Sequence, residues 1–289
     1  MSQRIRRDFG WLPDVPDFRD YSSATKSIKK LLKSIGIANP VKASLPESVD
    51  LRDWCSPVED QGNLGSCTAN AGVGLIEFFE RRAFGKHIDA SRLFLYKVTR
   101  NVSGLTGDTG AYLRDTMKAM VLFGVPPETQ WPYVIEDFEM EPSAFCYAYA
   151  QNFQATEYYR LDPPGTDRDE LLQRIKANLA ASLPSMFGFS VFSSIDQMDG
   201  GEIPYPSRHE SHMGGHAVVA IGYDDAKEIE NPNDGYVSTG AFLIRNSWGE
   251  AWGEDGYGWL PYDYVTYWLA VDWWSLLNNE WVDTGVFEA

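Results

Sequence analysis

An α+β fold with two subdomains is what the sequence predicts, and two changes along the chain carry that prediction. Mostly apolar segments of helical length occupy much of the first half, and short apolar or alternating runs between Gly- and Asp-rich turns occupy the second half. Helices that come before strands in this order favour separate helical and β halves. A cleft between two such halves is a usual position for a substrate site.

The individual elements follow from local patterns. Apolar periodicity over ten or more residues predicts four helices: Cys67–Arg82, Ala90–Arg100, Tyr112–Phe123 and Glu170–Ala181. Short runs bounded by turn residues predict four strands: Ser185–Val191, His216–Tyr223, Gly240–Asn246 and Gly256–Leu260.

Length and composition indicate a folded protein of one large domain or two modest ones. The chain has 289 residues, of which 44% are hydrophobic and 23% charged, and a net charge of −16. An excess of negative charge repels phosphate backbones, so nucleic acid is not an expected partner. We expect no transmembrane segment and no secretory signal, since no run of 18 apolar residues occurs and no apolar stretch follows the first arginines. The compartment therefore stays open.

The first 44 residues differ in charge from the rest. They carry nine basic and four acidic residues, a net charge of +5, so the remainder carries −21. Opposite charges on two segments favour docking of one on the other. Within this arm, Ile28, Leu31, Leu32 and Ile35 have helical spacing and predict a short amphipathic helix, which Gly36 and Pro40 end.

The first candidate functional motif is QGNLGSCT, from Gln61 to Thr68. Cys67 stands at the predicted start of a helix, where the partial positive charge of the N-terminus favours a thiolate. Gln61 offers a side-chain amide donor nearby. Taken alone, Cys67 could equally be a core cysteine.

The second and third motifs supply groups that could activate a thiol. His216 opens an apolar strand in MGGHAVVAIGY, where Gly215 and Ala217 leave room for a peptide to approach, although a histidine can also simply cap a strand end. Asn246 ends a buried strand in FLIRNSWGEAWGEDGYG, where it could orient a histidine ring while Trp248 shields the bond from water.

Together these motifs resemble the papain-like cysteine peptidases, the family of papain and the cathepsins. His216 follows Cys67 by about 150 residues, which is within the usual spacing, and Asn246 by about 180, which is long. The excess falls in residues 224–239, which we interpret as an inserted surface loop. The start LPESVDLRD at Leu45 is similar to the family's mature N-terminus, and Gly107–Tyr112 is similar to its substrate-binding strand.

The resemblance implies a papain-like two-subdomain fold, with a helical left half, a β-barrel-like right half and an active-site cleft between them. Residues 45–289 would form the catalytic domain, with the helical half at about 55–155 and the β half at about 156–289. Residues 1–44 would form a prosegment-like arm. We expect this arm to act as an intramolecular inhibitor or gate, with removal near Ala38 to Leu45; the alternative is a solvated tail or a partner-binding arm.

The implied function is a cysteine endopeptidase that acts on peptides or proteins without a cofactor. Cys67 and His216 would form a thiolate–imidazolium pair that yields an acyl-enzyme, and Asn246 would hold the imidazole ring. Gln61 and the Cys67 N–H would stabilise the oxyanion. The implied substrate-binding residues are Gly110, Ala111, Gly215, Ala217 and Trp248.

Several positions depart from the family pattern. Leu64 stands where the family usually has a cysteine, and Asp108 stands where its disulfide partner would lie. The joint absence fits a reducing compartment or a bacterial-type branch. Thr68 replaces a tryptophan, and Ala111 replaces a glycine, which would tighten the substrate-binding strand.

Two rival readings of these motifs have different chemistry. His209, His212 and His216 could suggest a metal site, but Gly214 and Gly215 would break the helix needed to align them, so we expect no metal. A catalytically inactive papain-like binding module is the other alternative. The tail from Tyr262 to Ala289 contains four tryptophans, which we expect in a core or packed flap, with a partner surface as the alternative.

Overall fold

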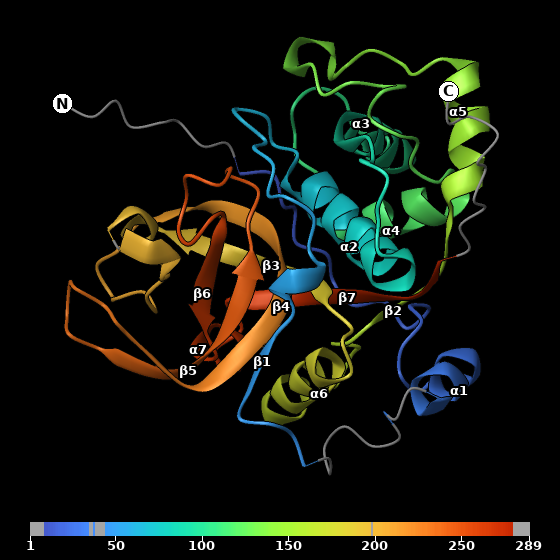
Figure 1. Ribbon diagram of the computed structural model, residues 1–289. Coiled ribbons are helices and arrows are strands. Elements are labelled where there is room, and N and C mark those ends of the chain that lie inside the picture. Colours follow the sequence, from blue (N-terminus) through green and yellow to red (C-terminus); the bar gives the residue numbers. More distant parts are fainter. Residues whose placement is uncertain (1–8, 35–36, 38–43, 198, 280–289) are drawn as a thin grey trace.

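Figure 1 shows the computed structural model of the chain, which describes residues 9–34, 37, 44–197 and 199–279. Helices α2, α3, α4 and α5 gather in one part of the molecule and most of the strands in another, as the α+β prediction requires (Figure 1). The chain just after residue 8 runs between these two parts before it reaches α1 (Figure 1).

The helical part is built around α2 (Cys67–Phe84), whose residues are mostly buried. Gly85 ends this helix in the left-handed conformation that favours glycine. Helix α3 (Arg92–Ser103) begins at Ser91, whose side chain accepts a hydrogen bond from the Phe94 amide. The other helices here are α4 (Leu113–Leu122) and α5 (Ala144–Ala150). The three helices predicted for this part are confirmed to within a few residues.

The strands form one antiparallel sheet in the order β2-β7-β3-β4-β5-β6, with β1 paired to β4. Their bounds are β1 Ser48–Asp50, β2 Ala155–Arg160, β3 Ser185–Phe192, β4 His212–Glu230, β5 Val237–Arg245, β6 Tyr257–Pro261 and β7 Ala270–Asn279. The four predicted strands correspond to β3, β4, β5 and β6. The sequence patterns did not reveal β1, β2 or β7.

The tryptophan-rich tail is part of the core as far as the structure describes it. After the short helix α7 (Asp263–Thr266) the chain forms β7, in which Trp273 and Trp274 are fully buried. Trp273 stacks on Phe187 of β3, with ring centroids 3.8 Å apart. Trp268 is more exposed, and Trp281 lies outside the described residues.

The prediction of an inserted surface loop at residues 224–239 is wrong. Strands β4 and β5 continue through this segment as a hairpin in which Ile229 pairs with Ser238 and Glu230 with Val237. Ile229 is buried, which gives the hairpin a hydrophobic anchor that a loop would lack.

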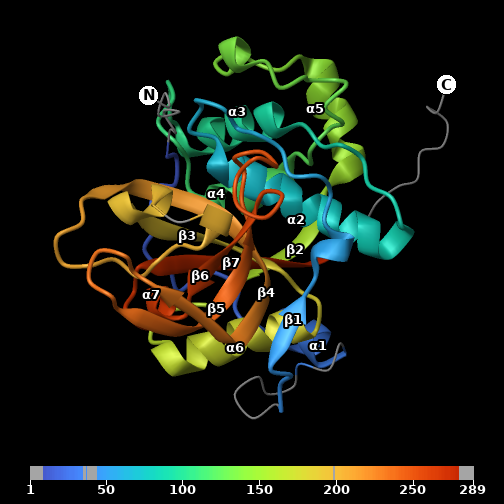
Figure 2. The ribbon, with the colours of Figure 1, turned by 60° about the vertical axis from the view of Figure 1, so that its left-hand side comes forward.

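Two helices lie beside the sheet. Helix α6 (Arg168–Ala180) begins at Asp167, whose carboxylate accepts hydrogen bonds from the first-turn amides, and it contacts β4. Helix α1 (Lys26–Ser34) contacts β7 and buries Ile28 and Leu32, as its predicted amphipathic pattern requires. In Figure 2, α1 and α6 both lie below the strands. Ile35, Gly36 and Pro40 lie outside the described residues. Among the residues described, none of the helices combines the length and the apolar character that a membrane span needs.

Candidate active site

The Cys67 side chain lies at the first residue of α2 and is fully buried. Backbone N–H groups of Ala217, Gly10 and Thr68 lie close enough to lower the pKa of this thiol. Burial nevertheless raises the pKa of the Cys67 thiol to about 11. This direction is opposite to that expected from the helix terminus alone, because covering by the N-terminal arm removes the water that would stabilise a thiolate.

His216 and Asn246 form a hydrogen-bonded pair under an aromatic cover. The ring Nε2 of His216 lies 2.8 Å from Oδ1 of Asn246, and both residues are buried. Because an amide oxygen only accepts, Nε2 carries the hydrogen. Trp248 stacks on the His216 ring at a centroid distance of 4.6 Å. The imidazole is thus fixed in tautomer and orientation, with Nδ1 on its other side.

The Gln61 side chain is held at both ends. Its oxygen accepts a hydrogen bond of 2.6 Å from the Ser247 hydroxyl, and its nitrogen donates one of 2.8 Å to the Leu64 carbonyl. An amide nitrogen carries two N–H groups, and the bond to Leu64 takes one of them. The sequence analysis missed the supporting role of Ser247, although this residue directly follows Asn246 in the third motif.

Asp108 makes hydrogen bonds at the position where the family has a disulfide. Its carboxylate accepts from the Gly65 amide, at 3.0 Å and 3.1 Å, and from the Tyr96 hydroxyl. The loop before Cys67 is therefore tied to the segment that contains Gly110 without a covalent bond. All three cysteines, Cys55, Cys67 and Cys146, are buried and free.

The N-terminal arm runs directly through this site. The Ala111 amide donates to the Gly10 carbonyl at 2.8 Å, and the Leu12 amide donates to the Ala111 carbonyl at 3.0 Å. On the opposite side, the Trp11 amide donates to the Gly215 carbonyl at 3.0 Å. The arm thus occupies the backbone groups that the sequence assigned to substrate binding.

The residues around Cys67 leave space only for a glycine in the arm. A Cβ built on Gly10 would lie 1.8 Å from the Gly65 carbonyl oxygen. The preceding residue, Phe9, packs edge-on against the rings of His216 and Trp248. The arm therefore passes Cys67 at Gly10, its smallest residue, and packs the Phe9 ring against His216.

Trp11 fills a pocket on the other side of Gly10. Cβ atoms built on Gly188 and Gly215 would lie 1.9 Å and 2.7 Å from its indole ring, so both glycines are needed for it to fit. The indole N–H donates to Oδ2 of Asp272 at 3.2 Å. Neither Trp11 nor Asp272 was identified from the sequence, and no local pattern marks either of them.

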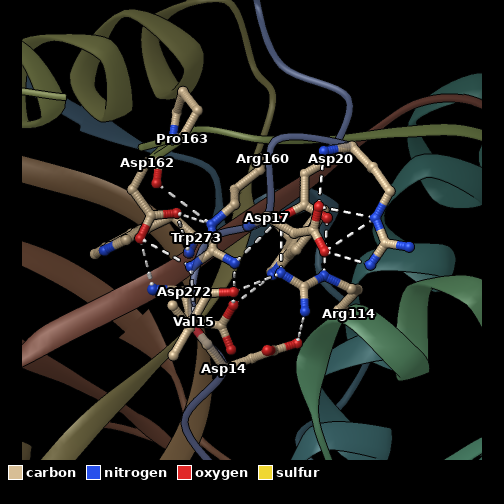
Figure 3. A network of polar contacts seen from close by, with 12 residues as sticks. Asp14, Val15, Asp17, Asp20, Arg114, Arg160, Asp162, Pro163, Asp272 and Trp273 are labelled. Atoms are coloured by element: carbon tan, nitrogen blue, oxygen red, sulfur yellow. Dashed lines mark hydrogen bonds and ion pairs between the residues drawn. The ribbon is translucent and has the colours of Figure 1, made fainter. Parts of the chain in front are cut away.

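A network of ion pairs fixes the arm next to this pocket (Figure 3). Arg114 of α4 pairs with Asp14 and with Asp20, the latter at 2.8 Å, and donates to the Val15 carbonyl. Arg160 of β2 lies 3.6 Å from Asp20. It also pairs with Asp162 at 2.9 Å and with Asp272 at 3.2 Å. The docking contacts thus reverse the signs expected from net charge, since arm carboxylates meet body arginines.

No metal site emerges from the described residues around the three histidines. Their ligand atoms do not form a group of three within 4.8 Å, because His216 is turned toward Asn246. A group that does meet this distance consists of Glu59, Asp89 and Glu128, at which Arg92 already supplies a positive charge.

The sequence-assigned residues converge on one place. Around the path of residues 9–12 lie Cys67, His216, Asn246, Gln61, Gly110, Ala111, Gly215, Ala217 and Trp248. They come from α2 and the loop before it, β4, the turn after β5 and the loop before α4. This arrangement combines a thiol, an oriented imidazole and amide donors, which together can support acyl transfer.

Comparison with known proteins places this geometry in context. A sequence profile described as papain family cysteine protease matches residues 45–266. An uncharacterized peptidase C1-like protein, L477 of Acanthamoeba polyphaga mimivirus, is 33% identical over 94% of this chain and 87% of its own length. Cathepsin K of Gallus gallus is 30% identical over 73% of this chain, and the match spans 58% of the cathepsin.

Solved structures agree with these matches. Xylellain, a cysteine protease from Xylella fastidiosa, superposes with a TM-score of 0.72 at 36% identity, covering 94% of this chain and 97% of xylellain. Procathepsin L 3 from the larval midgut of Tenebrio molitor gives a TM-score of 0.61 over 82% of this chain and 71% of its own, and at 21% identity it supports the fold alone.

Proposed function

The chain belongs to the papain family of cysteine proteases, and we propose that Cys67 is the nucleophile with which this peptidase cleaves its substrates. The observation that carries the proposal is the fixed pair of His216 and Asn246, 2.8 Å apart, together with the position of the next residue, Ala217, whose backbone lies beside the Cys67 thiol. The comparisons give no support to the inactive binding-module alternative.

The proposed reaction begins when Cys67 transfers its proton to Nδ1 of His216 and its sulfur attacks a peptide carbonyl carbon. The Gln61 side chain and the Cys67 amide then stabilise the oxyanion. His216 returns the proton to the leaving amine, so a C–S bond forms as the C–N bond breaks. Water activated by His216 finally hydrolyses the thioester. Asn246 and Trp248 keep the imidazole in place throughout.

Labelling with an epoxysuccinyl inhibitor tests this assignment. We expect mass spectrometry to find the adduct on Cys67, and Cys67→Ser to remove both the adduct and peptidase activity on fluorogenic peptides. The matched control is Cys55→Ser, since Cys55 is also buried and burial raises the pKa of its thiol to about 11. Labelling at Cys55, or full activity in Cys67→Ser, would refute the assignment.

We further propose that residues 9–20 hold the peptidase in a closed, inactive state. The arm covers Cys67 and uses the backbone groups of Ala111 and Gly215 that a substrate needs. The Gly10 N–H is near enough to the Cys67 thiol to lower its pKa, so the arm presents to the sulfur a backbone donor, which is not an electrophile. This contact explains how the enzyme could hold its own chain in the cleft without cutting it.

A comparison of the full chain with one that starts at Leu45 tests the closed state. We expect Cys67 labelling and peptide cleavage to be faster in the shorter chain, with the gain abolished by adding a peptide of residues 1–44. Equal rates in both forms, with both folded by circular dichroism, would leave the peptidase assignment intact and remove the gate.

A further inference from the structure

The pocket that holds Trp11 lies on the acyl side of the cleft, and the argument for this rests on the function proposed above. Phe9 packs on His216, the residue that would protonate the leaving amine. Gly10 lies at the Cys67 thiol, and Trp11 follows on the far side. A substrate side chain in the Trp11 pocket therefore belongs to the residue next to the one whose carbonyl Cys67 attacks, away from the leaving group.

The shape of this pocket suits a flat, two-ring side chain. Its walls at Gly188 and Gly215 are bare backbone, and a Cβ at either position would overlap the indole ring. Trp11 is 6% exposed although it comes from a segment without its own regular structure. The pocket is therefore large enough for an indole and closed enough to desolvate it.

The floor of the pocket is a buried carboxylate with a fixed orientation. Asp272 has no solvent exposure; its Oδ1 accepts from the Trp274 indole at 2.7 Å, and Arg160 lies 3.2 Å away. Its Oδ2 accepts the Trp11 N–H. Asp272 also has a φ of 64°, a left-handed conformation that is uncommon outside glycine and is often kept where a side chain must be aimed.

The charge around Asp272 favours a neutral donor over a cation. With the arm in place, four carboxylates surround the guanidinium groups of Arg114 and Arg160. When the arm leaves, Asp14 and Asp20 leave with it. Asp162 and Asp272 remain paired with Arg160, and Arg114 lies beside the same Trp274 ring as Arg160, so the cluster then holds two carboxylates and two guanidinium groups. A lysine or arginine side chain would add a positive charge to a balanced buried group, whereas an indole N–H adds none.

We infer that Asp272 is a specificity-determining residue that selects tryptophan at the second residue on the acyl side of the cleaved bond. The indole fills the space between Gly188 and Gly215, and its N–H replaces that of Trp11 on Asp272. A side chain of equal size without the N–H leaves a buried carboxylate oxygen short of one donor, which weakens binding.

Peptide binding to the full chain carrying Cys67→Ala and Trp11→Ala tests this without relying on catalysis. The peptides are identical except at that position, which holds tryptophan, 3-benzothienylalanine, leucine or arginine; benzothienylalanine has the shape of tryptophan with sulfur in place of N–H. Burial raises the pKa of Asp272 to about 7, so binding is measured at pH 8.5, where Asp272 is ionised. There we expect tryptophan to bind about tenfold more tightly than benzothienylalanine, as for a hydrogen bond to a charged group. The same ratio should appear in kcat/KM, mainly through KM, when Cys67 is restored.

Asp272→Asn should bring the ratio of tryptophan to benzothienylalanine close to one. Asparagine tolerates the left-handed backbone, but it has a single acceptor oxygen, and with that oxygen on the Trp274 indole its NH2 group, a donor, faces the bound side chain. Asp255→Asn is the matched control, since Asp255 also has a positive φ but is exposed on a turn. A ratio near one with Asp272 present, an unchanged ratio in Asp272→Asn, or stronger binding of arginine than of tryptophan would overturn the inference.

A second measurement uses the arm itself as the occupant of the pocket. Trp11→Phe removes the N–H and should raise the rate of Cys67 alkylation by iodoacetamide about tenfold in the full chain, but should add nothing in an Asp272→Asn background. If Trp11→Phe raises the alkylation rate by the same factor with and without Asp272→Asn, then Trp11 and Asp272 do not interact and the inference is wrong. If Cys67 proves not to be the nucleophile, these ratios still report on the pocket, so failure of the two proposals can be told apart.

Discussion

A single methyl group at Gly10 should open the closed state. The Cβ of Gly10→Ala would lie 1.8 Å from the Gly65 carbonyl oxygen and 2.3 Å from its carbon. These are backbone atoms of the loop before Cys67, and the Asp108 hydrogen bonds to the Gly65 amide hold that loop. The overlap cannot be relieved by a side-chain rotation, so we expect the arm to move away.

The expected magnitude follows from the free energy of overpacking. Forcing extra carbon into a packed site destabilises it by about 1–3 kcal/mol. If this destabilisation applies to the closed state alone, the ratio of open to closed molecules rises about fivefold to 150-fold. The second-order rate of Cys67 labelling by an epoxysuccinyl inhibitor in the full chain should rise by the same factor until the open form dominates.

The control is Val15→Ala, which changes an exposed side chain in the same arm. Its labelling rate should match that of the unchanged chain. If Gly10→Ala is folded by circular dichroism and its Cys67 is labelled no faster than in Val15→Ala, then the arm does not limit access to the thiol and the reasoning fails.

Three other substitutions give independent checks. Arg114→Gln removes the guanidinium that Asp14 and Asp20 share and leaves Asp20 only the longer contact to Arg160, so Cys67 labelling in the full chain should accelerate about tenfold or more; an unchanged rate would mean that the Arg114 ion pairs do not hold the arm. Asn246→Ala should lower kcat about tenfold or more with little change in KM, because His216 loses the acceptor that orients its ring. The measurement uses fluorogenic peptides and a chain that starts at Leu45. Burial raises the pKa of Glu80 to about 8 from an ordinary value of 4.5. Between these two pH values the Glu80 carboxyl is protonated in the folded state and ionised in the unfolded state. The free energy of unfolding therefore decreases as the pH rises from about 4.5 to 8. Glu80→Gln, which keeps an acceptor for the Ile88 amide, should flatten that decline in urea denaturation at pH 5 and pH 8.5, and an equally steep decline would contradict it.

The sequence was informative wherever a local pattern carries the structural reason. Apolar periodicity located α2, and short apolar runs located β3 to β6, because burial imposes those periods directly. His216 and Asn246 stood out for the same reason, since each borders an apolar run: His216 lies in β4 where its buried stretch begins, four residues later than the strand itself, and Asn246 directly follows β5. The fold class is confirmed, and the site residues it implied lie together in space.

What the sequence did not reveal depends on contacts between distant segments. Trp11 and Asp272 are separated by 261 positions, and nothing near either residue predicts that they meet. Strand β7, which contains Asp272, is rich in tryptophan and lacks an alternating pattern because both of its faces are covered. The residues of this pocket come from segments far apart in the sequence, so no short sequence motif can reveal it.

The charge of the arm shows why a net sum can indicate docking and still misidentify the contacts. The lysines of α1 are exposed, where salt and water screen them over about 8–10 Å. The contacts that the structure forms are desolvated ones, in which Arg114 is 14% exposed and Asp20 7%. Charges removed from water need specific partners at short range, so two of the four acidic residues of a basic arm, Asp14 and Asp20, decide where it lies. The same requirement makes Arg160 with Asp162 a permanent part of the pocket, because these two remain paired when the arm departs.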